Sequence, residues 1–330
     1  MTGHQIAASP SSLDRPGAGT IRFCAFADIH YYPGIFPHDS REWLERILSR
    51  AVASQCGLVI HMGDLTHAPA ECGDYVDFYN DFAIPCRHTI GNHDDDGNTH
   101  QATLDAYRLE CGHYHFDMGG FRFIVADTNY CLIDGRWVHY SEGNYYAVAS
   151  ANRLNVSRVP PFELEWLEDV IENSPHPCVV TSHASFERPV CGSPDGEAVR
   201  AIFNKANARH PGRVRLAING HHHCDNMRIL DGIVYLDLNS ASYAWFDEAH
   251  TSYPAGYTTR WRLANHTVMW DDPLSAVITM THDGFIGVEG MLSRFHLGVS
   301  PELAKRPAVD PDGRHVTPAI KTVSLRCPFL

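Results

Sequence analysis

Residues 21–30 of the chain read IRFCAFADIH. The apolar run from Ile21 to Ala27 has the length and composition of a buried β-strand, and it stops abruptly at Asp28 and His30. A loop with aromatic residues, proline and glycine follows. This segment therefore predicts a strand whose carboxyl end carries two polar side chains.

The same arrangement repeats along the chain. The apolar run 58–62 ends in Gly63 and Asp64, and helical patterns of apolar residues separate it from the runs on either side. Strands that alternate with helices in this way predict βαβ units and a largely parallel sheet, in which ligands bind beyond the carboxyl ends of the strands. The polar side chains at the predicted strand ends are Asp28 with His30, Asp64, Asn92 with His93, His183, and His221 with His223.

These side chains are suited to binding metal ions. Carboxylate oxygens and imidazole nitrogens fit Mn, Fe or Zn better than calcium, and the absence of cysteine from the set argues against a structural zinc site. On an extended segment, residues i and i+2 point the same way, so Asp28 and His30 are expected to converge, as are His221 and His223. His222 is then expected to point elsewhere.

The ordered motifs D-x-H, GD, GNHD, a lone histidine and GHxH run from Asp28 to His223 and resemble the signature of the calcineurin-like metallophosphoesterases. Several motifs in the correct order are far more specific than any one of them. The resemblance implies a dinuclear centre of two divalent or trivalent metal ions, Mn, Fe or Zn. The implied ligands are Asp28, His30 and His223 for the first ion, Asn92, His183 and His221 for the second, and Asp64 as the bridge between both.

The resemblance also implies a reaction. Two metal ions lower the pKa of a bridging water towards about 7, which gives a hydroxide placed for in-line attack on phosphorus. His93 follows the ligand Asn92 without being a ligand in the family, and it is the candidate to protonate the leaving oxygen or to stabilise its charge. Asp94 is expected to orient this imidazole or to shape the entrance to the site. The expected activity is metal-dependent hydrolysis of a small-molecule phosphate ester.

Departures from the motifs of particular branches narrow the resemblance. The chain begins with D-x-H at Asp28, where purple acid phosphatases have D-x-G, and it has His67 where they supply a tyrosine ligand. Ser/Thr protein phosphatases have aspartate at the position of His67 and continue with Arg-Gly, whereas this chain continues with Ala68-Pro69. The remaining similarity is to the bacterial phosphodiesterase-like group, which includes class III cyclic-nucleotide and glycerophosphodiester hydrolases.

Three classes of function stay open at this point. A phosphodiesterase is the first prediction. A phosphomonoesterase, or phosphatase, uses the same dinuclear site and differs in how the pocket treats the second substituent of the phosphate. An inactive binding scaffold of the same fold, such as a retromer subunit, is the third, and the presence of His93 speaks against it.

Substrate contacts are expected from Tyr31, His67, Asn129 and Tyr243. Aromatic side chains in this set, together with Tyr32 and Trp245, could stack on a base or a sugar. For any one of them, a place in the core or in a lid is the alternative. His67 could contact a substrate phosphate, form a hydrogen bond with His93 or face solvent.

Charge and composition limit the partners. Lys and Arg total 26 against 39 Asp and Glu, and the net charge of −13 has the wrong sign for binding long nucleic acid through its phosphates. Bound metal ions would neutralise some of these carboxylates, so small phosphate esters stay possible.

No apolar run approaches the roughly 18 residues that a membrane span needs. The 10 cysteines are irregularly spaced without a CxxC, which favours buried reduced thiols in a cytoplasmic protein. The oligomeric state stays open.

The expected fold is a four-layered α/β/β/α sandwich with two mixed sheets packed between helices. The layering is implied by the resemblance, while the residues themselves indicate a βαβ first half and a hairpin-rich second half, each expected to supply one sheet. The expected organisation is a disordered leader over residues 1–20, a metallophosphoesterase domain over 21–290 and a C-terminal extension over 291–330. Proline interruptions and weak periodicity suggest that the extension wraps the surface.

Overall fold

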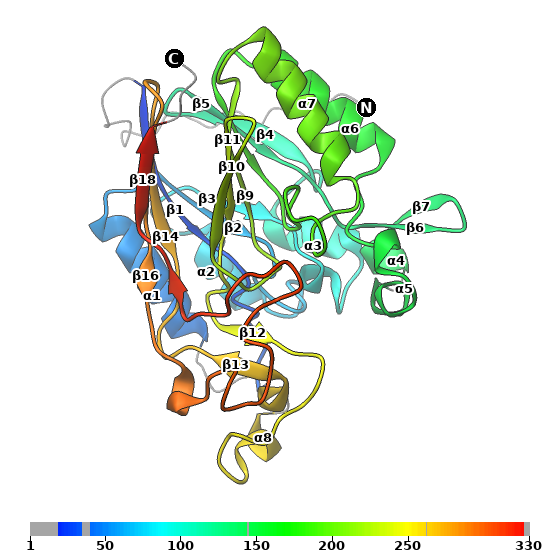
Figure 1. Ribbon diagram of the computed structural model, residues 1–330, viewed down its shortest axis with the longest axis vertical. Helices are drawn as coiled ribbons and strands as arrows, with labels where there is room; N and C mark the ends of the chain where they lie inside the picture. The colour runs from blue at the N-terminus through cyan, green and yellow to red at the C-terminus, as the bar shows by residue number, and fades with distance from the viewer. Residues whose placement is uncertain (1–18, 35–39, 144, 262, 327–330) are drawn as a thin grey trace.

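The computed structural model describes residues 19–34, 40–143, 145–261 and 263–326, and two six-stranded mixed sheets form its centre (Figure 1). The first sheet has the strand order β18-β15-β14-β1-β2-β3. Strands β1, β2 and β3 run parallel, whereas β14, β15 and β18 pair antiparallel. The bounds are β1 (Thr20–Phe26), β2 (Leu58–Met62), β3 (Cys86–Thr89), β14 (Ala276–Thr281), β15 (Phe285–Glu289) and β18 (Val323–Arg326).

The second sheet has the order β10-β11-β9-β8-β5-β4. Its central strands β11, β9, β8 and β5 are parallel, and an antiparallel strand closes each edge. Hairpins that turn at Gly119-Gly120 and Asp231-Gly232 supply these edges. The bounds are β4 (Tyr114–Met118), β5 (Phe121–Val125), β8 (Cys178–Thr181), β9 (Val214–Asn219), β10 (Asn226–Leu230) and β11 (Ile233–Asp237).

Helices cover the outer face of each sheet, and the side chains of the strands alternate between the two sides. Phe123 of β5 meets Phe23 of β1 between the sheets at a ring-centroid distance of 5.3 Å, whereas the neighbouring Ile124 packs under the helices of the second sheet. The predicted four-layered sandwich is therefore confirmed (Figure 1). The covering helices are α1 (Ser40–Ala53), α2 (Gly73–Asn80) and α3 (His100–Tyr107) on the first sheet, and α6 (Pro161–Glu172) and α7 (Gly196–Arg209) on the second.

One expectation about the sheets was wrong, because the two halves of the chain do not each supply one sheet. In the second half of the chain, β14 and β15 form a hairpin that turns at Asp283-Gly284, and β14 pairs with β1 in the first sheet. Strand β1 has an edge on the side away from β2, and the buried residues Val277 and Met280 of β14 cover it. Periodicity identifies a hairpin, but it does not say which sheet edge the hairpin joins.

The structure describes little of the predicted N-terminal leader and most of the predicted C-terminal extension. The leader over residues 1–20 lies outside the described residues as far as position 18, and Thr20 already belongs to β1. In the extension 291–330, β17 (Ala319–Ile320) pairs with β16 (Met291–Leu292), and β18 adds an edge strand to the first sheet. Across the part of the chain that the structure describes, no helix combines the length and apolarity needed to cross a membrane.

Two excursions leave the sandwich. The first connects β5 to α6, and a small cluster of Cys131, Tyr140 and Val156 holds it together. The second, drawn at the bottom of Figure 1, lies between β11 and β14. The first consists of β6 (Tyr130–Ile133), β7 (Arg136–His139), α4 (Tyr140–Gly143) and α5 (Tyr145–Ala151), and the second contains β12 (Tyr243–Trp245), α8 (Tyr257–Arg260) and β13 (Thr267–Met269).

Candidate active site

Three of the predicted ligands meet where β1 and β9 end. Nε2 of His223 lies 3.5 Å from Oδ1 of Asp28 and 3.2 Å from Nε2 of His30, and the latter nitrogen lies 3.8 Å from Asp28 Oδ1. Asp28 and His30 are fully buried, and His223 is half-buried. The structure thus brings together the group expected to bind a first ion.

A second group lies beside the first. Nε2 of His183 is 3.2 Å from Asp64 Oδ2, 3.1 Å from Asn92 Oδ1 and 3.1 Å from Nδ1 of His221. The same Oδ2 of Asp64 lies 3.7 Å from Nε2 of His30 in the first group. Asp64 therefore stands between the two groups, as a bridging carboxylate would.

The chemistry of these groups fits two cations. Ring nitrogens and carboxylate oxygens with lone pairs face one another at 3.1–3.8 Å in a buried space. Burial holds the pKa of His30 well below its usual range, and its Nδ1 has no hydrogen-bond partner among the described residues. Neutral imidazole and carboxylate are the forms that bind Mn, Fe or Zn. The residues present are therefore able to hold a dinuclear centre.

The backbone at these residues departs from the prediction. Asp28, His30, Asp64, His221 and His223 all have positive φ, between 48° and 69°, so their side chains converge from left-handed turns rather than from an extended segment. For residues other than glycine this conformation costs of the order of 1–3 kcal/mol each and clusters at functional sites. Strand β1 ends at Phe26, and the turn beyond it is stabilised by the amides of Asp28 and His30, which donate to the carbonyls of Gly63 and Asp64 at 3.1 and 2.9 Å.

Two of the glycines before the ligands leave room that no other residue would. A Cβ atom on Gly91 would lie 2.2 Å from Asp64 Oδ1, and one on Gly63 would lie 2.2 Å from Nδ1 of His183. Gly63 also has φ of 94°, which side-chain-bearing residues rarely adopt. A side chain at either position would therefore displace a potential ligand.

His93 lies beside the first group of potential ligands, with its ring centroid 4.9 Å from that of His30. Its Nδ1 lies 2.6 Å from Oδ2 of Asp96 and 2.8 Å from the hydroxyl of Tyr146, which donates to Oδ1 of Asp96 at 2.6 Å. Burial opposes protonation of His93, but the charges of Asp64 and Asp96 outweigh it and raise the pKa to about 9. The imidazole is therefore held by a carboxylate and a phenol.

The carboxylate beside His93 is that of Asp96, which corrects the expectation for Asp94. Asp94 is fully buried and accepts hydrogen bonds from the backbone amides of Gly91, Asp64 and Thr66 at 2.8–3.1 Å and from the hydroxyl of Tyr107 at 2.6 Å. It therefore fixes the backbone of the turns that carry the ligands.

Sequence reasoning did not identify Asp96 or Tyr146. Residues His93–Asp95 form a 3-10 helix, η1, and Asp96 lies three residues after His93, which is the spacing that brings side chains together on a helical turn. That spacing was a usable signal. Tyr146 contacts His93 from α5, 53 positions away in the sequence, and no local sequence pattern predicts such a contact.

The family follows from a comparison of sequences. The profile described as calcineurin-like phosphoesterase matches residues 21–225, more than half of the chain. The chain belongs to this family. Calcineurin-like phosphoesterases are hydrolases of phosphate esters with a dinuclear metal centre, and the His and Asp clusters described above could bind metal in this member. No curated protein sequence matches the chain with significance.

Solved structures of low sequence identity share the fold. A dimetal phosphatase from Danio rerio superposes with a TM-score of 0.60 at 14% identity, covering 94% of this chain and 99% of the other. GAP50, the anchor in the inner membrane complex of Plasmodium, superposes with a TM-score of 0.50 at 12% identity, covering 83% and 85%. At these identities the likeness shows the calcineurin-like phosphoesterase fold alone.

The four substrate-contact candidates of this calcineurin-like phosphoesterase differ in their placement. His67 lies at the site, with Nδ1 3.0 Å from Asp96 Oδ2 and a ring-centroid distance of 4.7 Å to His93. Tyr243 is buried, packs its ring 5.1 Å from that of His30, and accepts at its carbonyl the 2.7 Å hydrogen bond of His223 Nδ1. Its position supports the ligands.

The other two candidates, Asn129 and Tyr31, make contacts within the protein. Asn129 is buried and donates from Nδ2 to the carbonyl of Ile90 at 2.8 Å, which ties the end of β5 to the end of β3. Tyr31 stacks on Tyr75 at a centroid distance of 4.0 Å. The expectation that Asn129 contacts substrate is corrected by this placement, and Tyr31 packs against α2 through Tyr75.

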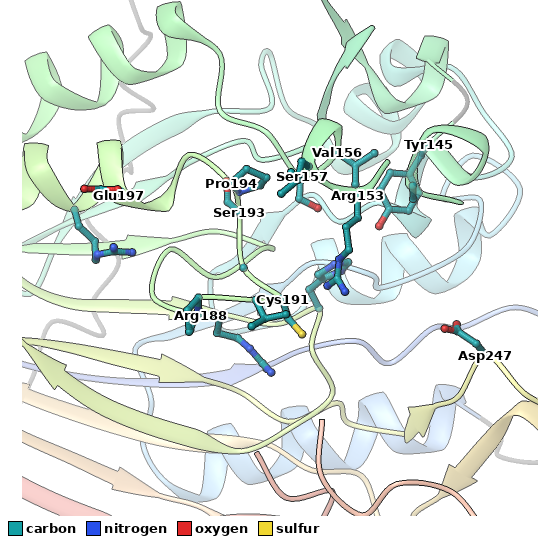
Figure 2. Close-up of a pocket in the computed structure, with 17 residues that line it drawn as sticks. Tyr145, Arg153, Val156, Ser157, Arg188, Cys191, Ser193, Pro194, Glu197 and Asp247 are labelled. Carbon is teal, nitrogen blue, oxygen red and sulfur yellow. The ribbon is translucent and has the colours of Figure 1, made fainter. Parts of the chain in front are cut away.

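A cavity of about 620 Å³ adjoins the second ligand group, because His221 is part of its wall. Figure 2 shows other residues that line it. Arg153 projects into it from the segment after α5, and Asp247 lies across from Arg153. Tyr145 and Cys191 also line the cavity. The family's dinuclear site thus opens on one side into a space with both cationic and anionic walls.

Proposed function

We propose that this calcineurin-like phosphoesterase hydrolyses a small-molecule phosphodiester. Asp28, His30, His223, Asp64, Asn92, His183 and His221 would hold two metal ions. The observation that supports a diester is the cavity of about 620 Å³ beside His221, because a diester carries a second organic group that must be housed next to the metals. The motif similarity to the bacterial phosphodiesterase-like group points the same way.

Two bound ions would supply an activated water and polarise the phosphate oxygens. The protein's own contribution to bond cleavage comes from His93, whose ring faces the ligand groups and whose Nδ1 is held by Asp96 and Tyr146. With Nδ1 occupied in this way, Nε2 is the nitrogen free to donate a proton to the leaving oxygen. His67, beside His93, would add a donor for a phosphate oxygen.

A phosphomonoesterase is the second candidate, and Arg153 is the observation that favours it. A monoester carries more negative charge than a diester, and a guanidinium in the same cavity as His221 would stabilise it. The two candidates therefore make different demands on this residue. Arg153→Met is expected to weaken monoester hydrolysis strongly and diester hydrolysis only slightly.

The test compares bis-p-nitrophenyl phosphate with p-nitrophenyl phosphate as substrates of the manganese-loaded protein. We expect a higher kcat/KM for the diester, and loss of both activities in Asp64→Asn. A clear preference for the monoester would replace the first proposal with the second. A protein that binds manganese and hydrolyses neither these esters nor a wider panel of mono- and diesters would be a binding scaffold.

A further inference from the structure

A second cluster of potential ligands lies apart from the dinuclear site, between η1, α3 and the end of β7. Asp95, His100 and His139 each offer one ligand atom, and these atoms all lie within 4.8 Å of one another. Oδ2 of Asp95 lies 3.6 Å from Nδ1 of His100 and 3.6 Å from Nδ1 of His139. Asp95 is 6% exposed and His139 is 8% exposed, so the group is largely shielded from water.

These atoms are not satisfied by one another. Asp95 Oδ2 and His100 Nδ1 are buried atoms without a hydrogen-bond partner among the described residues, and a separation of 3.6 Å is too long for a hydrogen bond. Leaving such polar atoms unpaired in the interior destabilises the folded protein. A ligand that lies between them would remove this penalty.

The separations suit a metal ion. Zinc bonds to nitrogen and oxygen of about 2.0–2.1 Å in a tetrahedron place neighbouring ligand atoms about 3.3–3.4 Å apart. The observed 3.6 Å distances need only a small contraction around the carboxylate to reach that value. Two imidazoles and one carboxylate are also a common ligand set for zinc, with a fourth position left for water.

Neighbouring side chains orient the cluster as they do around bound metals. Thr103 donates from Oγ1 to Oδ1 of Asp95 at 2.7 Å, which leaves Oδ2 directed at the two histidines. Nδ1 of His139 also lies 3.3 Å from the hydroxyl of Ser141, which an ion would displace. The other nitrogen, Nε2, has no hydrogen-bond partner among the described residues and lies 3.5 Å from Oδ2 of Asp127, which is 2% exposed and becomes its partner after a small shift. A carboxylate on the far nitrogen of a metal-bound histidine fixes its ring orientation and strengthens it as a ligand.

We propose that Asp95, His100 and His139 bind one divalent transition metal ion, with zinc as the best fit, at a site separate from the dinuclear centre. Asp127 orients His139 in this site. Asp95 belongs to η1, the same short helix as His93, and His139 ends the strand that leads into α4 and α5, where Tyr146 lies. The ion would therefore fasten the excursion that carries Tyr146 to the turn that carries His93.

The experiment measures zinc stoichiometry in the full chain after the dinuclear centre has been dismantled. In the variant with Asp28→Ala, His30→Ala, Asp64→Asn and His183→Ala, which breaks every other group of three potential ligands among the described residues, we expect one tightly bound equivalent of zinc by calorimetry and elemental analysis after the protein is stripped of metal and titrated. Adding His139→Ala should remove it, with at least a tenfold loss of affinity. Adding His115→Ala, a substitution of a buried histidine in β4 outside the cluster, should leave it.

Each result bears on this site alone. No bound equivalent in the dismantled variant, or an equivalent that persists after His139→Ala, would overturn the proposal whether or not the phosphodiesterase assignment holds. Should His139→Ala fail to fold by circular dichroism, His100→Gln replaces it, because His100 is half-buried in the first turn of α3. Cobalt gives a second readout, because cobalt bound in a tetrahedral site absorbs visible light. This absorption band must disappear in the variant with His100→Gln.

Discussion

Oδ2 of Asp96 lies 2.6 Å from Nδ1 of His93, and the hydroxyl of Tyr146 contacts both residues. A carboxylate at Nδ1 fixes the tautomer and the direction of the imidazole, so that in the proposed reaction Nε2 would face the phosphate. Asp96 is thus a positioning residue for His93. The arrangement joins η1 to α5, two segments that are far apart in the sequence.

Asp96→Asn is expected to lower kcat by roughly 10- to 100-fold with little change in KM, which is less than the roughly 10²–10⁴-fold that a lost general acid costs. The loss should be largest for poor leaving groups, because these need the proton most. Kinetics with a series of aryl phosphodiesters of graded leaving-group pKa would measure this. Asp105→Asn, on the exposed side of α3, is the control, and an equal loss for all leaving groups would contradict the assigned role.

Gly91→Ala is expected to disrupt the dinuclear centre without unfolding the sandwich. The added Cβ would meet Asp64 at its Oδ1 and at its backbone nitrogen, at 2.2 and 2.5 Å, so the carboxylate that we propose as the bridge must shift. A displacement of about 1 Å at such a site can cost roughly 100-fold in rate. Activity and bound manganese should fall together. The control is Gly73→Ala, where a Cβ meets nothing within 4 Å, and normal activity in Gly91→Ala would contradict the prediction.

The sequence predicted which side chains gather at the site, but not the backbone that gathers them. Apolar runs that end in Asp28, Asp64 or His183 indicate strand ends, and parallel strands place such ends together. The left-handed turns at Asp28 and His30 could not be foreseen, because neither residue type favours positive φ enough to be recognised from sequence. Local pattern sets the positions of ligands, whereas tertiary contacts set their orientation.

The same limit explains the other errors. Asn129 follows a strand as the ligands do, yet its amide is used to join β5 to β3, and a polar residue at a strand end looks the same in either role. Tyr146 reaches the site through an excursion whose short helices have little periodicity. The placement of β14 beside β1 likewise depends on a contact between the two ends of the chain.

Removal of metal is expected to lower the thermal stability of the protein. The ligands are buried, their lone pairs face one another, and ions that bind only the folded state stabilise it by mass action, by about 2.7 kcal/mol at a free concentration of 100 times the Kd. Scanning calorimetry with a chelator and after addition of manganese would measure the difference in Tm. The variant Asp64→Asn should show a much smaller difference, and an unchanged Tm in the unsubstituted protein would contradict metal binding at this centre.

Arg188 is expected to be a major contributor to the attachment of the C-terminal segment. Its side chain is fully buried, its Nε lies 3.0 Å from Oδ2 of Asp312, and Nη2 pairs closely with Asp310. Asp312 also accepts hydrogen bonds from the amides of Val190 and Cys191 at 2.9 and 3.0 Å. The guanidinium therefore connects the loop after β8 to a segment more than a hundred residues later.

Arg188→Met should lower the free energy of unfolding by about 3–5 kcal/mol, because it leaves buried carboxylates without their partner. Cleavage by a protease near residues 310–314 should become faster. Addition of Asp312→Asn should recover part of the lost free energy of unfolding, since it removes one of the carboxylate charges that Arg188→Met leaves without a partner. Lys321→Met is the matched control, because that lysine is 76% exposed and its pairing with Asp225 at 3.9 Å is expected to contribute at most about 1 kcal/mol. Urea unfolding of the four proteins measures these differences, and equal losses for Arg188→Met and Lys321→Met would show that the buried cluster does not hold the segment.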